Sequence, residues 1–127
     1  MSLQAPLAKV LGHGSARQGT GHWWGQRLTA IALVPLTVWF VVAVMGMPHG
    51  NWHAVSAWVA EPLNAILMIL LVLTTVYHSN LGLQVVVEDY VHGATGIATL
   101  IAVKFAHVVL AVAGLYAVIV ISVGAGR

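Results

Sequence analysis

Residues 63–87 read LNAILMILLVLTTVYHSNLGLQVVV, a run that contains no Asp, Glu, Lys or Arg. An α-helix crosses about 30 Å of hydrocarbon with about 20 residues, because each residue adds about 1.5 Å. The run is therefore long and apolar enough to span a membrane. Pro62 stands directly before it, at a first-turn position where the missing N–H costs no helical hydrogen bond.

Two further apolar stretches flank this one. The first covers residues 28–47 and contains Pro35, which frees a backbone carbonyl and predicts a kink rather than a break. The other covers residues 97–123, after a predicted loop at Gly93–Gly96. We therefore expect an all-α chain with three transmembrane helices, preceded by a polar N-terminal arm at residues 1–27.

The composition favours a membrane over water. Of the 127 residues, 60% are hydrophobic and 6% are charged, whereas soluble domains carry about 25% charged residues. Residues 28–127 are thus expected to form one three-helix transmembrane anchor. The absence of cysteine excludes a disulfide, a thiolate metal site or an iron–sulfur cluster held by this chain. Five basic residues are too few for a nucleic-acid surface.

The basic residues predict the orientation in the membrane. Lys9, Arg17 and Arg27 precede the first span, whereas Pro48–Glu61 contains no Lys or Arg. The positive-inside rule then puts the N-terminus in the cytoplasm, and Lys104 can extend its amino group back toward that side. The N-terminal arm lacks the Arg- and Ser-rich character of a transit peptide, which favours a bacterial inner membrane.

His78 is an ionisable residue deep in the second span, and such residues normally face the interior of a bundle. Thr75, Ser79 and Gly82 share its helix face at helical spacing. One interpretation is a haem axial ligand whose ring is oriented by Ser79 or Thr75. The other is a neutral histidine that hydrogen-bonds across to another helix.

His107 in the third span is predicted at a depth similar to that of His78, about 15 Å from the cytoplasmic helix ends. Two imidazoles at one depth are a known arrangement for an electron-transfer haem, so His78 and His107 are one candidate pair of ligands within this chain. The alternative is that His107 packs beside Lys104 without a cofactor.

Two groups of polar and aromatic residues border the spans on the predicted cytoplasmic side. Glu88-Asp89-Tyr90 ends the second span, either as solvated carboxylates with an aromatic-belt tyrosine or as a phenol that donates to a carbonyl ligand. His22-Trp23-Trp24-Gly25-Gln26-Arg27 is typical of an interfacial anchor. Its arginine, assisted by His22, could also pair with a lipid phosphate or a haem propionate.

Several of these motifs together resemble the hydrophobic membrane-anchor subunits of succinate dehydrogenase, the D-subunit family of respiratory complex II. The resemblance rests on Gln26-Arg27-Leu28-Thr29-Ala30 at the first span and on His78 in the second. It also rests on Gly82, on Gln84 and on Glu88-Asp89-Tyr90-Val91, which stands at the family's distance from the histidine. The third span agrees by topology only.

The resemblance implies a role for each matching residue. His78 would be an axial ligand of haem b, with the second ligand on a companion cytochrome b subunit rather than within this chain. Tyr90 would hydrogen-bond a ubiquinone carbonyl, with Asp89 as its neighbour. Arg27 would lie near the haem propionates and the quinone pocket, and His22 is a weaker match for the propionates.

The same resemblance implies a non-catalytic subunit of a multi-subunit membrane helix bundle, docked to an iron–sulfur subunit and a flavoprotein subunit and surrounded by membrane lipids. Three other functions stay open at this point. A small transporter or channel subunit would use His78, His107 and Lys104 as an intramembrane path. A purely structural anchor would use its histidines only for packing. A fumarate-reductase-type anchor would work with a low-potential quinone.

Overall fold

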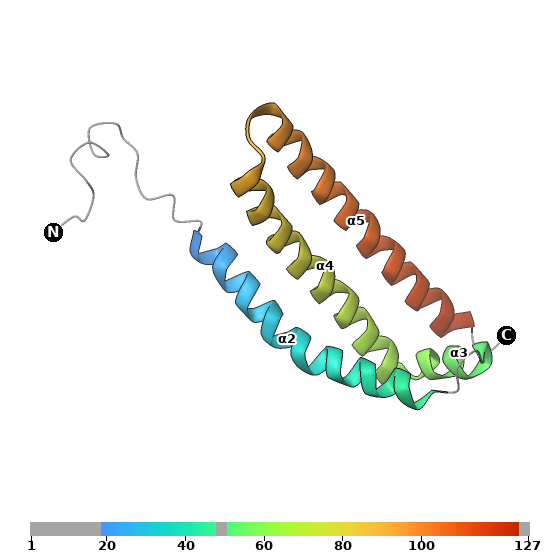
Figure 1. Ribbon diagram of the computed structural model, residues 1–127. Helices are drawn as coiled ribbons and strands as arrows, with labels where there is room; N and C mark the ends of the chain where they lie inside the picture. The colour runs from blue at the N-terminus through green and yellow to red at the C-terminus, as the bar shows by residue number, and fades with distance from the viewer. Residues whose placement is uncertain (1–18, 48–50, 125–127) are drawn as a thin grey trace.

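The computed structural model describes residues 19–47 and 51–124, and this part of the chain is almost entirely helical (Figure 1). It contains α2 (Gly19–Gly46), α3 (Trp52–Ala60), α4 (Pro62–Tyr90) and α5 (Gly93–Gly124). By length and composition, α2, α4 and α5 are each able to cross a membrane. The predicted all-α architecture with three membrane spans is therefore confirmed.

The long helices extend beyond their predicted apolar segments. Helix α2 begins at Gly19 rather than at residue 28, so His22 and Arg27 lie on the helix and not on an N-terminal arm. Helices of 28, 29 and 32 residues exceed the apolar segments because their polar and aromatic ends continue the same backbone hydrogen bonding. Residues 1–18 of the predicted arm, including Lys9 and Arg17, lie outside the described residues.

The connection between α4 and α5 is much tighter than the predicted loop at Gly93–Gly96, because α5 already begins at Gly93. Gly93 has a φ of 69°, in the left-handed region that glycine adopts without a Cβ clash. A Cβ added at Gly96 would collide with the backbone carbonyl of Val91. The two glycines therefore allow the chain to reverse direction within two residues.

The linker between the first two spans folds into the short helix α3 at the opposite end of the molecule. Asn51 caps this helix, because its side chain accepts a hydrogen bond from the Ala54 N–H at 3.2 Å. Trp58 stacks on Trp39 of α2 with ring centroids 5.4 Å apart, and its carbonyl accepts a bond from Asn64 of α4. Helix α3 thus ties the ends of α2 and α4 together.

Helix α4 lies between α2 and α5 and packs against both (Figure 1). Within the described ranges α2 and α5 make no contact with each other. The α4–α5 contact is close at Gly114, where an added Cβ would lie 2.8 Å from Val72. The three spans therefore form an open layer, and both outer helices keep long apolar faces that lipid or other membrane helices must cover.

Pro35 does not interrupt α2, which is continuous from Gly19 to Gly46. Figure 1 shows that this helix bends along its length, whereas α4 and α5 are straighter. A proline in a helix interior leaves the carbonyl four residues earlier without its donor, which is a common cause of such bending. The prediction that Pro35 does not break the helix is confirmed.

Candidate functional site

His78 lies in the contact between α4 and α2, where it is half-buried. Its Nδ1 is 2.8 Å from the Thr29 hydroxyl, and its Nε2 is 3.5 Å from the Gln26 side-chain nitrogen. The prediction that Ser79 or Thr75 orients this ring is wrong, because the partner comes from the neighbouring helix. The polar atoms around His78 belong to α2 and not to α4.

The hydrogen bonds of Thr29 determine which nitrogen of His78 carries the proton. The hydroxyl is 2.7 Å from the Gly25 carbonyl and 3.1 Å from the Gln26 carbonyl, and carbonyls only accept. Its single hydrogen is donated there, so its oxygen accepts a bond from His78 Nδ1–H. The neutral ring then carries an unprotonated Nε2, which is the form that binds metals.

Two glycines, one on each helix, lie in the α2–α4 contact near the histidine. A Cβ added at Gly25 would lie 3.2 Å from Leu81 and 3.3 Å from the Tyr77 hydroxyl, which is tight packing. A Cβ at Gly82 would make only an ordinary contact, 3.5 Å from the Gln26 amide. Gly25 therefore sets the approach of α2 to α4, and Gly82 leaves room for the Gln26 side chain.

Four side chains form what we call the α2–α4 polar cluster: His22, Gln26, Thr29 and His78. The first three follow one another at i, i+4 and i+7, so they share one face of α2. Within the described part of the chain, His22 Nε2 and Gln26 Oε1 are buried and lack a hydrogen-bond partner. An unpaired buried polar atom costs about 1–3 kcal/mol, so the cluster favours a bound group that supplies partners.

His107 belongs to the other side of α4. Its Nδ1 donates to the Val103 carbonyl at 2.7 Å, and its Nε2 is 3.1 Å from the Ser79 hydroxyl. Only 8% of the residue is exposed. Both ring nitrogens are paired inside the chain, and His78 faces a different helix. The two histidines therefore do not face one common site within the described residues, and His107 packs between α4 and α5.

The same separation affects the predicted intramembrane path. Lys104 lines a groove between α4 and α5 together with His107, whereas His78 faces α2. The three residues do not line one continuous channel in this chain. The transporter interpretation thereby loses the arrangement of residues on which it rested.

Tyr90 and Asp89 occupy the last turn of α4, at the end of the molecule where α2 begins (Figure 1). Both are exposed, and Tyr90 retains 80% of its accessible surface. Glu88 accepts a hydrogen bond from Gln84 at 2.8 Å. Twelve residues separate His78 from Tyr90, which is about 18 Å along the helix, so these residues form a second location and not part of the polar cluster.

Arg27 follows Gln26 directly in α2 but lies outside the polar cluster. It is exposed, and its guanidinium carbon lies 5.5 Å from the centroid of the Trp23 ring. Trp23 in turn meets Trp24 edge to face at 5.0 Å. This geometry agrees with the predicted interfacial anchor, in which an arginine and two tryptophans lie together at a helix end.

The described residues contain no group of three or more His, Cys, Asp or Glu side chains that could enclose a metal ion. What they offer is one histidine with an available nitrogen. Sequence reasoning missed Thr29 and Gln26 as the partners of this histidine. Their spacing with His22 would have indicated the shared helix face, had α2 been expected to begin before residue 22.

The sequence of the chain is similar to one family of known membrane proteins. The model of the succinate dehydrogenase/fumarate reductase transmembrane subunit family matches residues 1–121. The succinate dehydrogenase hydrophobic membrane anchor subunit of Rickettsia bellii is 35% identical, over 69% of this chain and 70% of that protein. The corresponding subunit of Paracoccus denitrificans is 32% identical, over 94% of this chain and 93% of that protein. No solved structure matches the chain.

Proposed function

Because the chain belongs to the succinate dehydrogenase/fumarate reductase transmembrane subunit family, we propose that it anchors a succinate:ubiquinone oxidoreductase in the membrane, shares a haem b with a companion subunit and helps form the ubiquinone site. The single observation that carries the haem assignment is the chain of hydrogen bonds from His78 through Thr29 to the Gly25 carbonyl. It leaves His78 Nε2 unprotonated inside a membrane span, with only the Gln26 amide nitrogen beside it, at 3.5 Å.

The polar cluster fits a haem. His78 would hold the haem iron through Nε2, and a histidine of the companion cytochrome b subunit would be the second protein ligand. Thr29 fixes the ring orientation and holds the proton on Nδ1, which also makes the imidazole a better ligand. The Gln26 amide, now 3.5 Å from Nε2, has to rotate away from the iron. A bound haem supplies reversible one-electron transfer.

Two basic side chains are proposed to bind the propionates of that haem. His22 lies one turn from Gln26 toward the start of α2, and its buried Nε2 has no partner within the described residues. A propionate would supply the missing acceptor. Arg27 reaches the same region only if its guanidinium leaves the Trp23 ring. A bidentate pair with a carboxylate is stronger than an exposed cation–π contact, which favours that movement.

The second location, at the end of α4, is proposed to bind ubiquinone. The Tyr90 hydroxyl donates a hydrogen bond to a quinone carbonyl, and Asp89 supports it from the preceding position. The exposure of Tyr90 supports this role, because a hydroxyl at a helix end is available to a ligand at the membrane surface. This chain then holds and orients the quinone, while the oxidation of succinate takes place on other subunits.

The proposed orientation puts the N-terminus and the α4–α5 connection on the cytoplasmic face of a bacterial inner membrane. Tyr90 and Asp89 then face the iron–sulfur subunit, with the flavoprotein subunit beyond it. The open arrangement of α2, α4 and α5 supports a companion membrane subunit, because three spans in one layer leave the polar cluster without a complete enclosure. The chain is thus a non-catalytic part of an enzyme.

The test is a dithionite-reduced minus oxidised absorption spectrum of the complex purified from its membrane. We expect His78→Ala to abolish the b-type signal. His107→Gln is the matched control, because it alters a histidine of similar depth on the opposite side of α4, and it should retain the signal. A His78→Ala complex with an unchanged haem spectrum would refute the ligand assignment.

A further inference from the structure

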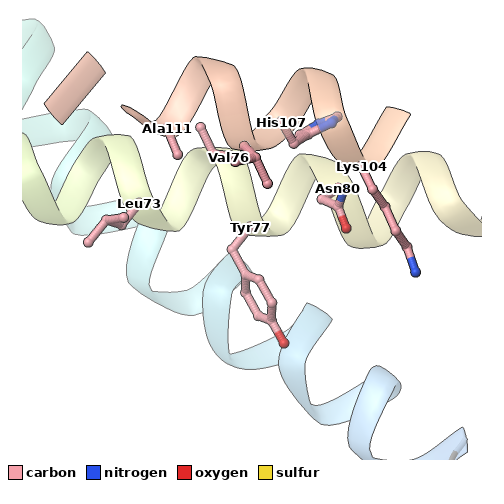
Figure 2. A pocket seen from close by; sticks show the side chains of 8 residues that line it. Leu73, Val76, Tyr77, Asn80, Lys104, His107 and Ala111 are labelled. Atoms are coloured by element: carbon pink, nitrogen blue, oxygen red, sulfur yellow. The ribbon is translucent and has the colours of Figure 1, made fainter. Parts of the chain in front are cut away.

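A groove of about 390 Å³ opens between α4 and α5 (Figure 2). The functions proposed above do not use it. Lys104 and Asn80 lie at one end of the groove, and Leu73 and Ala111 lie at the other. On each helix the two ends are seven residues apart, which is about 10 Å or about two helical turns. The groove therefore has the length of a short contact with another helix.

The polar end of the groove carries two side chains that have no partner within the described residues. In this part of α4, side-chain hydrogen bonds are formed by Asn64, His78, Ser79, Gln84 and Glu88, and not by Asn80. In α5 they are formed by Thr95, Thr99, His107 and Ser122, and not by Lys104. His107 also lines the groove, but both of its ring nitrogens are paired. An amide and an ammonium group are thus left for another molecule.

Lys104 lies within the membrane-spanning part of α5. It stands eleven residues after Gly93, about 16 Å along the helix, and three residues before His107. Its side chain is exposed on this chain, and Figure 2 shows its amino group pointing away from the apolar end of the groove. A charged side chain at such a depth is costly in hydrocarbon, so it normally pairs with another group inside a helix bundle.

The side chains of this protein do not supply the counter-charge of Lys104. Its three acidic residues are Glu61, Glu88 and Asp89, and all of them stand at the ends of α4. Glu88, the nearest to Asn80 along α4, is eight residues or about 12 Å beyond it. A second copy of the chain carries its carboxylates at the same helix ends and so lacks one at this depth. A membrane-spanning partner with a carboxylate of its own meets the requirement.

We propose that the groove between α4 and α5 receives a membrane-spanning helix of another subunit, which carries one Asp or Glu at the level of Lys104. The carboxylate accepts hydrogen bonds from the Lys104 ammonium and from the Asn80 amide. Both of its oxygens are then satisfied, as a buried ion pair requires, and the attraction is strong in a medium of low dielectric constant. Apolar side chains one and two turns further along the partner helix fill the groove over Val76 and Val108. This contact does not depend on the proposed haem and quinone roles.

The experiment treats the detergent-purified complex, with all its subunits, with dicyclohexylcarbodiimide, an apolar reagent that reaches carboxylates inside a membrane span. The reagent joins a carboxylate to an amine in direct contact as an amide, and it takes up the water that is lost and becomes a urea. We expect mass spectrometry to find Lys104 joined to an Asp or Glu in a membrane span of another subunit.

Two variants separate the charge of Lys104 from its amine. Lys104→Arg is the matched control, because it keeps the charge and the complex but should lose the cross-link. Lys104→Met leaves the partner's carboxylate without a counter-charge, so the complex should dissociate about tenfold more readily on dilution in detergent.

A wild-type complex in which Lys104 forms no cross-link, or is joined to Glu88 or Asp89, would overturn the proposal. So would a Lys104→Met complex that is as stable as Lys104→Arg. Acetylation of Lys104 by a water-soluble amine reagent in the intact complex would also overturn it, since the amino group would then reach the membrane surface and a lipid phosphate. The haem spectrum is recorded on the same samples, and its absence in wild type would count against the proposed haem site and not against this contact.

Discussion

The two sides of α4 each carry a buried or half-buried histidine, and the two histidines differ in how completely they are paired. On the α5 side, His107 donates to the Val103 carbonyl and faces the Ser79 hydroxyl, so both nitrogens have partners. On the α2 side, His78 has a short hydrogen bond only at Nδ1, where the Thr29 oxygen accepts from Nδ1–H, and the Gln26 amide stands 3.5 Å from Nε2. The role of an intramembrane histidine is therefore better judged by how strongly each ring nitrogen is paired than by its depth in the membrane.

The difference extends to the neighbours of each histidine. Around His107 both ring nitrogens are paired within this chain, and the helices approach closely two turns further along, at Gly114 and Val72. Around His78 two further buried polar atoms, His22 Nε2 and Gln26 Oε1, have no partner within the described residues. Such atoms cost stability unless another molecule satisfies them. One side of α4 is therefore satisfied within the described residues, whereas the other leaves buried polar atoms without partners.

The largest effect is expected from Thr29→Val, which removes the hydroxyl and keeps the shape of the side chain. His78 Nδ1–H then loses its acceptor, and the ring is no longer held in one orientation or one tautomer. Loss of such a supporting partner typically weakens metal binding about 10–100-fold. We expect haem to dissociate from the variant complex about 10–100-fold more readily, measured by haem retention during dilution in detergent.

Thr29→Ser is the control for that variant, because it keeps the hydroxyl and should keep the haem. The midpoint potential separates a positioning role from a purely structural one, since altered hydrogen bonding to the imidazole changes the potential of the haem that remains. If Thr29→Val retained haem with the wild-type potential, the hydrogen bonds through Thr29 would have no role in ligation.

The sequence predicted the three spans and identified His78 as a candidate functional residue, because long apolar runs and an intramembrane histidine are strong local signals. It did not reveal the partner of that histidine. Thr75 and Ser79 were expected from spacing along α4, but which face of α4 meets which helix is decided by packing between helices. Gly25 is the residue that brings α2 close enough for Thr29 to reach His78.

The predicted start of the first span, at residue 28, also differs from the observed start of α2, for a physical reason. Hydropathy marks the part of a helix that lies in hydrocarbon, whereas α2 continues through Trp23 and Trp24 back to Gly19. The shared face of His22 with Gln26 exists only because of this extension. The short helix α3 was likewise not predicted, and its Trp58 packs on Trp39 of α2.

An intermediate effect is expected from Ser79→Ala, which tests the completed side of α4. The Nε2 of His107 would lose its partner in a buried contact between α4 and α5. We expect a decrease in the free energy of unfolding of about 1–2 kcal/mol, measured as a lower thermal midpoint of the purified complex. The haem spectrum should stay unchanged, because His78 faces α2.

Ser79→Thr keeps the hydroxyl and serves as the control for stability. A Ser79→Ala complex with normal stability but an altered haem spectrum would contradict the proposal that haem lies on the α2 side of α4 and that the α5 side serves packing. In that case His107, and not His78, would be the histidine coupled to the haem.

The smallest effect is expected from Tyr90→Phe. This variant tests the end of α4 independently of the faces that contact α2 and α5. Only the hydroxyl is removed, and one hydrogen bond to a quinone carbonyl is worth about 0.5–1.5 kcal/mol. We therefore expect kcat/KM for ubiquinone to fall about threefold to tenfold, with unchanged haem content, because His78 lies about 18 Å away along the helix. Asp89→Asn, which leaves the phenol in place, should have a weaker effect. Wild-type quinone kinetics in Tyr90→Phe would show that this tyrosine serves only the membrane interface, and the ligand roles of α4 would then be confined to the side that faces α2.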